Sequence, residues 1–106
     1  MNKNQIQHGD VLLQRVETLP KGVKIVARRN GIIIVAEGEM TGHHHVIAER
    51  GATLMELQGE LYLEVTEPVT ITHEEHKSLP IPEGIYRIGI VKEYDYLRDM
   101  ERQIRD

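Results

Sequence analysis

Residues 40–49 read MTGHHHVIAE and place three consecutive histidines directly after a glycine. Residues 69–76, VTITHEEH, carry two more, so five of the six histidines lie in two short stretches. Imidazole nitrogens and carboxylate oxygens are common ligands of divalent transition metals. The two stretches predict a metal site if the fold brings them together, and solvated turns if it does not.

The alternation of side chains along a β-strand decides which of these residues can share one site. In a strand through residues 43–49 the odd-numbered side chains face one way, whereas His44 faces the other. In VTITH the valine and the isoleucine are natural inward residues, so His73, which has the same parity, is expected to face the interior. His76 can join only if the chain bends after His73. The candidate metal ligands are His43, His45, Glu49, His73 and His76.

These ligand types suit one divalent transition metal, and they do not choose among Zn, Mn, Fe, Ni and Cu. The HEEH segment is not the helical zinc-protease motif, because that motif separates its histidines by four positions whereas His73 and His76 are three apart. No residue is assigned a catalytic role, and the sequence does not decide whether the protein is an enzyme.

The first histidine segment resembles the first motif of the cupin superfamily, in which HxH is followed three or four residues later by Glu. The resemblance implies a small β-barrel that holds one divalent metal, with ligand roles for His43, His45 and Glu49. In the second cupin motif a histidine follows P-x-G after two residues. Residues 82–84 supply that turn, but Arg87 stands at the ligand position. One of the two histidines of the second segment would have to replace it.

A broader resemblance covers most of the chain, from HGDVLLQRV to KEYDY. Over this length the sequence resembles a group of small bacterial and phage-borne proteins without an assigned function. This second resemblance implies no mechanism.

Composition limits both the fold and the chemistry. The chain has 106 residues, enough for one domain with one modest core. It lacks cysteine, which excludes disulfides, thiolate ligands and a cysteine nucleophile. It also lacks Phe and Trp, so Val, Ile and Leu must fill the core, and these residues favour β-structure.

Charge and hydropathy limit the kinds of partner that the protein is expected to bind. The formal net charge is −4 and no dense basic block occurs, so nucleic-acid binding is not expected. The N-terminal residues lack the apolar run of a signal peptide, and no segment approaches the roughly 18 apolar residues of a membrane span. The sequence predicts a cytoplasmic protein with no membrane partner.

Short apolar segments recur between turn signals at intervals of about 10 residues, which is typical of all-β folds. The dipeptide Asn30-Gly31 is the strongest of these signals, and it predicts a hairpin between residues 23–29 and 32–38. The predicted fold is all-β, a small cupin-like barrel or β-roll. Residues 1–94 form this domain, and residues 95–106 are expected to form a short C-terminal helix because apolar residues recur there at three- and four-residue steps.

Two hypotheses for function follow. In the first, the protein binds one divalent metal at its histidines and acts on a small polar ligand, with or without catalysis. In the second, it is a noncatalytic protein-interaction module whose histidines lie on the surface and whose tail forms a homodimer or docks a partner.

Overall fold

A computed structural model describes residues 4–37, 44–74 and 76–90 of the chain. These residues form ten β-strands and no helix, which confirms the all-β prediction. The predicted helix at 95–106 lies outside the described residues. In chain order the strands are β1 (Gln5–His8), β2 (Val11–Val16), β3 (Lys24–Ile25), β4 (Ile33–Glu37), β5 (His44–Ile47), β6 (Ala52–Leu57), β7 (Glu60–Val65), β8 (Val69–Ile71), β9 (Leu79–Ile81) and β10 (Gly84–Ile90).

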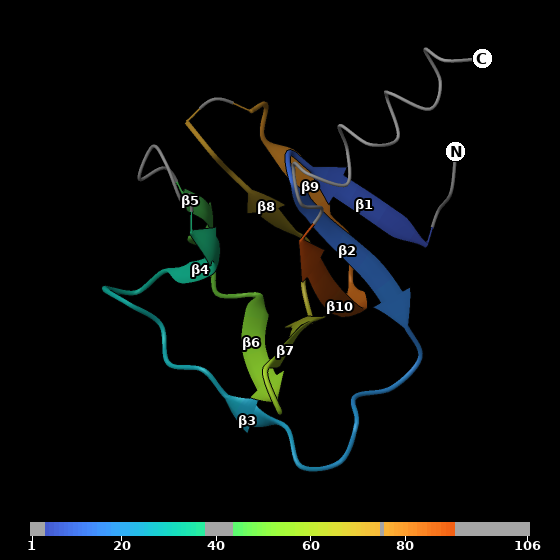
Figure 1. Cartoon of the computed structure of the whole chain (residues 1–106). Coiled ribbons are helices and arrows are strands. Elements are labelled where there is room, and N and C mark those ends of the chain that lie inside the picture. The colour runs from blue at the N-terminus through green and yellow to red at the C-terminus, as the bar shows by residue number, and fades with distance from the viewer. Residues whose placement is uncertain (1–3, 38–43, 75, 91–106) are drawn as a thin grey trace, which may run out of the picture.

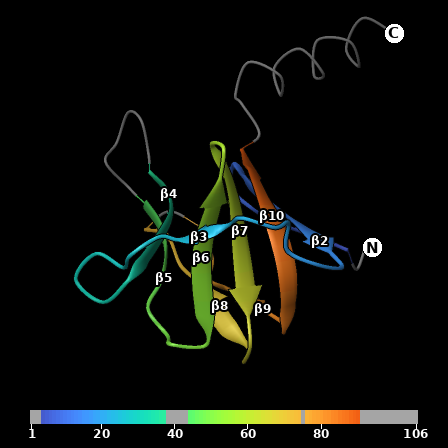
Figure 2. The same ribbon diagram turned by 90° about the horizontal axis from the view of Figure 1, so that it is seen from below.

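Six strands form one antiparallel sheet in the order β1-β2-β10-β7-β6-β3. The longest strand, β10, lies near the centre of this sheet between β2 and β7. Figure 2 shows β6, β7 and β10 side by side, with the β4–β5 hairpin beside them. The sheet is the platform on which the remaining strands pack.

The other four strands form two hairpins, β4–β5 and β8–β9. An antiparallel bridge between Val46 and Thr72 joins them, with backbone N–H···O distances of 2.9 and 3.0 Å. Figure 1 shows β5 and β8 as neighbours. The two histidine-bearing segments are therefore held side by side.

The core lies between the six-stranded sheet and the two hairpins. The sheet contributes alternate residues of its strands, and the hairpins contribute apolar residues from β4, β5, β8 and β9. The aliphatic side chains that are 0% exposed are Val11, Leu13, Ile47, Leu63, Ile71 and Ile81. This aliphatic interior agrees with the composition, which offers no Phe or Trp.

The sheets do not close into the predicted cupin-like barrel. In the described part of the chain, β1 and β3 are edges of the large sheet that pair on one side only. Pro80 lies in β9 and has no N–H to give to a further strand. Within the same residues the Val46–Thr72 bridge alone pairs the two hairpins, so the hydrogen-bond ladder stays open.

The turn at Asn30-Gly31 is confirmed, but the predicted hairpin is not. Both residues have positive φ, 51° and 81°, as a two-residue turn of this kind requires. Arg29 and Ile32 flank the turn with a single bridge. Residues 24–25 pair with β6 instead of β4. Between them and the turn, the guanidinium group of Arg28 donates to the carbonyl oxygens of Gly31, Glu49 and Ala52.

No helix among the described residues is long and apolar enough to cross a membrane.

Two isoleucines test where the core lies. Ile81 is 0% exposed and Ile25 is 73% exposed. Ile81→Ala is expected to lower the free energy of unfolding by about 2–5 kcal/mol because it removes buried methyl groups and leaves a cavity. Ile25→Ala, the matched control, is expected to change it by less than about 0.5 kcal/mol. Chemical denaturation measures both, and equal effects would contradict this description of the core.

Candidate functional site: a buried histidine cluster

Strand β5 presents its two described histidines to opposite sides, as the alternation argument predicted. His45 is 3% exposed and shares its face with the enclosed Ile47. His44 and Val46 are half-buried on the other face. His45 is therefore an interior residue, and the hypothesis of surface histidines does not describe it.

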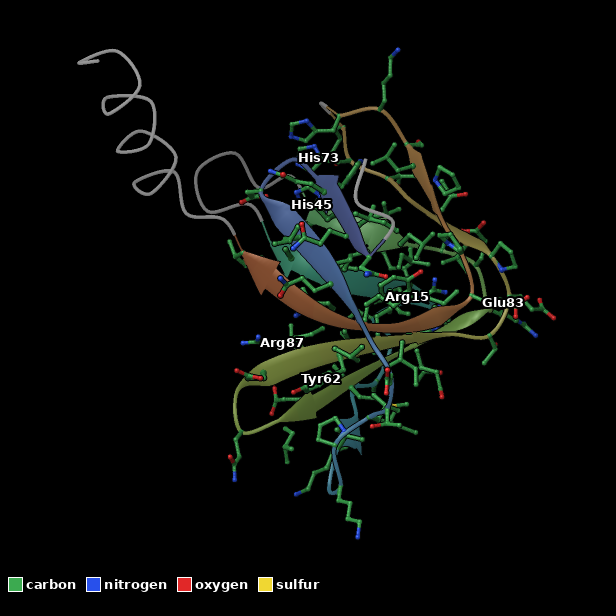
Figure 3. All side chains as sticks on the ribbon, turned by 90° about the vertical axis from the view of Figure 1, so that its right-hand side faces the viewer. Arg15, His45, Tyr62, His73, Glu83 and Arg87 are labelled. Atoms are coloured by element: carbon green, nitrogen blue, oxygen red, sulfur yellow. The ribbon has the colours of Figure 1, made fainter. Side chains whose placement is uncertain are left out.

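The Val46–Thr72 bridge places His45 next to His73. In an antiparallel pair the residues on either side of a bridge oppose one another, so position 45 meets position 73. The ring centroids of these two histidines are 4.4 Å apart. Figure 3 shows them together, well away from Tyr62 and Arg87. The expectation that the two histidine segments meet is confirmed for this pair.

A third histidine, His8, enters the cluster from β1. It is 2% exposed, and its ring centroid lies 5.0 Å from that of His45. The turn Gly9-Asp10 joins β1 to β2 and pairs His8 with the enclosed Val11. Cross-strand partners share a face, so the inward position of Val11 is the sequence signal that could have assigned His8 to the interior.

The rings of His8 and His45 meet through their Nδ1 atoms, which are 2.9 Å apart. The Nε2 atom of His8 donates to the carbonyl oxygen of Lys77 at 2.7 Å, since a carbonyl only accepts. The Nε2 atom of His45 lies 3.0 Å from a carboxylate oxygen of Asp10, which likewise accepts from it. When both Nε2 atoms carry hydrogen, two Nδ1 lone pairs face each other in a buried space.

Burial sets the electrostatics of this pair. Desolvation lowers the pKa of His8, and the neighbouring His76 and His73 lower it further, against the opposing effect of the Lys77 carbonyl. Desolvation also lowers the pKa of His45, with His73 adding to the effect and Asp10 opposing it. Both rings therefore resist taking up a proton, although their facing lone pairs favour a cation between them.

His76 completes a group of four rings. The chain bends after His73, as the sequence required, and brings the centroid of His76 to 4.7 Å from that of His73. The same centroid lies 5.7 Å from that of His8 and 5.9 Å from that of His45. His76 is exposed, so one side of the cluster borders solvent.

Gly9 lies against these rings. A Cβ atom built at this position would be 2.6 Å from Nε2 of His76 and 3.0 Å from Cε1 of His45. The backbone φ of Gly9 is 62°, a conformation that favours glycine. The turn between β1 and β2 can therefore approach the cluster closely only because residue 9 has no side chain.

One predicted ligand, Glu49, does not join the cluster in the structure. The carboxylate of Glu49 accepts a hydrogen bond from the backbone N–H of Thr70 at 2.9 Å and is exposed. The alternation argument fails there because β5 ends at Ile47. His43 lies outside the described residues. Conversely, the predicted ligand set left out His8 and Asp10, because a His-Gly-Asp stretch is usually only a turn, and the structure places both at the cluster.

Within residues 4–37, 44–74 and 76–90, no three His, Asp or Glu side chains are already arranged to hold a metal ion. The four rings lie close together, and they approach one another edge to face, tilted or, for His45 and His76, stacked.

The lowered pKa values of His8 and His45 predict how the stability of the metal-free protein depends on pH. The folded protein binds fewer protons at His8 and His45 than the unfolded chain, so the stabilisation is present above pH about 6.5 and is lost as the pH falls below it. The denaturation midpoint should therefore fall as the pH is lowered from about 8 to about 5. His8→Gln keeps a donor for the Lys77 carbonyl and should flatten the decrease. A midpoint that rises on acidification would contradict this electrostatic account.

Comparison with known proteins shows that the chain matches one protein family. Residues 7–90 match the family described as Domain of unknown function (DUF8820), and the match is to this family and not to a cupin. No curated protein and no solved structure matches the chain. The matched segment contains all four clustered histidines and Asp10. The chain belongs to the DUF8820 family.

Proposed function

We propose that this protein binds one divalent transition metal at the cluster of His8, His45, His73 and His76. The observation that carries the proposal is the approach of the Nδ1 atoms of His8 and His45 to 2.9 Å while both Nε2 atoms are held by acceptors. Two buried lone pairs at this distance repel unless a cation lies between them.

A proton or a metal ion can supply that cation. A shared proton would make one ring an imidazolium, and burial and the neighbouring histidines oppose this charge on both rings. A metal ion accepts both lone pairs at once and is favoured by neutral imidazoles. The low proton affinity of the pair therefore supports the metal over the proton.

The spacing of the rings supports the same proposal. Four imidazoles bound tetrahedrally at 2.0–2.1 Å would have their centroids about 3.2 Å from the ion and about 5 Å from one another. The six centroid separations of the cluster range from 4.4 to 6.4 Å. These separations are close to those expected around one ion, whereas the ring orientations are not those of a bound ion.

Metal uptake then requires only local movement. The two Nδ1 atoms would separate from 2.9 Å to about 3.3 Å, and the rings of His73 and His76 would turn their nitrogens inward. Side-chain rotations of this kind are rapid for residues near the surface, and His76 is exposed. His76 therefore marks the side from which an ion enters.

The groups around the cluster suit this role. Metal-binding histidines usually donate their other ring N–H to a carboxylate or a backbone carbonyl, which fixes the tautomer and the ring orientation. Asp10 and the Lys77 carbonyl hold these positions for His45 and His8.

Elemental analysis of untagged protein tests the proposal. About one equivalent of Zn, Mn, Fe, Ni or Cu is expected, retained on gel filtration and lost in His45→Ala and His73→Ala. His44→Ala is the matched control, because His44 faces away from His45, and it should retain the metal. Glu49→Gln should also retain it, since the Glu49 carboxylate is bound to Thr70. No metal in the purified protein, together with no uptake when each ion is offered, would refute the proposal.

Asp10 provides a second, graded test. Asp10→Ala leaves all four imidazoles in place and removes only the carboxylate that orients His45. Metal affinity measured by competition with a chelator should fall roughly 10- to 100-fold, the usual effect of losing such a partner. An unchanged affinity would show that Asp10 does not position a ligand.

A further inference from the structure

The strands at the margins of the sheets differ in how their outer sides are blocked from further pairing. Among the described strands, β1, β3, β4 and β9 each form a ladder on one side only. Natural proteins usually block such an edge with a proline, a bulge, a charged side chain or a very short strand. β9 contains Pro80, and β4 shifts its register between Ile34 and Ala36. β3 has only two residues, one of them Lys24.

β1 carries none of these features. Its sequence is QIQH, without Pro, Lys, Arg, Asp or Glu, and its register against β2 is continuous. Figure 1 shows it beside β2, and no described strand pairs with its other side. Of the four margins in the described part of the chain, β1 is therefore the one without a feature that blocks a further strand.

The hydrogen bonds between β1 and β2 show which backbone groups of β1 face outward. The N–H of Arg15 donates to the carbonyl oxygen of Asn4 at 2.7 Å, so these two residues form a hydrogen-bonded pair. Hydrogen-bonded and non-hydrogen-bonded pairs alternate along an antiparallel ladder. Gln5 and Gln7 therefore form non-hydrogen-bonded pairs with β2, and their N–H and C=O groups point away from it. Their two-residue spacing is that required to bond one further strand.

The side chains of β1 are suited to pairing with a second copy of the same strand. Gln5 and Gln7 are exposed on the outer face of the sheet. An amide both donates and accepts hydrogen bonds, so it can pair with an identical amide, whereas a charged residue would meet its own like charge. Ile6 lies on the inner face, opposite the enclosed Leu13, and is only half-buried. A second Ile6 beside it would bury more of this apolar side chain.

We infer that two copies of this protein associate through β1, with the two strands antiparallel about a two-fold axis at Ile6. Gln5 of one copy then opposes Gln7 of the other, and each such pair exchanges two backbone hydrogen bonds. The two Ile6 side chains meet as a non-hydrogen-bonded pair, in which side chains approach closely. A two-fold axis gives both copies the same contact, so the dimer is closed. This inference does not rest on the proposed metal site.

Sedimentation velocity of the untagged 106-residue chain measures the association directly. Protein concentrations from about 10 μM to about 1 mM cover the range expected for a weak dimer. The weight-average sedimentation coefficient should rise from that of a monomer toward that of a dimer across this range, because so short a strand pair forms a small interface. A monomer at every concentration would overturn the inference, as would assembly beyond a dimer.

Gln7→Pro tests whether the backbone of β1 forms the contact. It removes an outward N–H and spares the hydrogen bonds to β2, in which that N–H takes no part. The dissociation constant of the dimer should rise about tenfold or more, since two hydrogen bonds are lost per dimer. Gln7→Ala keeps the N–H and is the matched control, with a smaller expected rise. Circular dichroism checks that both variants fold, and a dimer unchanged by Gln7→Pro would overturn the inference.

Paired charge variants test the two-fold register. A chain with both Gln5→Lys and Gln7→Lys would set like charges opposite each other in the dimer, and so would a chain with both Gln5→Glu and Gln7→Glu. Each variant alone should therefore be monomeric, whereas an equal mixture should form a dimer with one copy of each. Persistent dimers of either variant alone, or no mixed dimer, would overturn the inference. Either result would leave the metal proposal standing, because metal content is measured separately.

Discussion

Two backbone hydrogen bonds between Val46 and Thr72 connect the β4–β5 hairpin to the β8–β9 hairpin, and the histidine cluster depends on this connection. They join β5 to the end of β8, and thereby set His45 opposite His73 on the buried side and His44 beside Thr72 on the outer side. Because side chains alternate along both segments, a shift of the pairing by one residue would exchange the two faces. The inward position of His45 and the outward position of His44 therefore depend on the same register.

The buried pair of His8 and His45 is the costly element of the structure. Burial of polar rings is tolerated when their nitrogens are bonded. Two of the four ring nitrogens, the Nε2 atoms, have acceptors, and the two Nδ1 atoms face each other, so a cation or a shared proton is needed between them. The aliphatic core around β2 and β5 keeps these rings out of water and lowers their proton affinity. Packing and site chemistry are thus coupled through desolvation.

Local patterns in the sequence predicted the local features well. Alternation separated His44 from His45 and turned His73 inward, and Asn30-Gly31 marked a turn with two positive φ values. The contacts that depend on pairing or packing between residues far apart in the sequence were not predicted. His8 and Asp10 reach His45 only through the register of β1 and β2 and the packing of that hairpin on β5, and Glu49 misses the cluster because β5 ends two residues earlier. Barrel closure depends on edge pairing that Pro80 and the short β3 do not support.

The approach of Gly9 to the cluster gives a criterion for reading related sequences. Any side chain at this position would displace the ring of His76 and press on that of His45. Relatives that keep the four histidines should therefore keep glycine at this turn, and a relative with a larger residue there must have rearranged its histidines. The presence of glycine at this turn in a related sequence is thus a simple indicator that the histidine cluster is preserved.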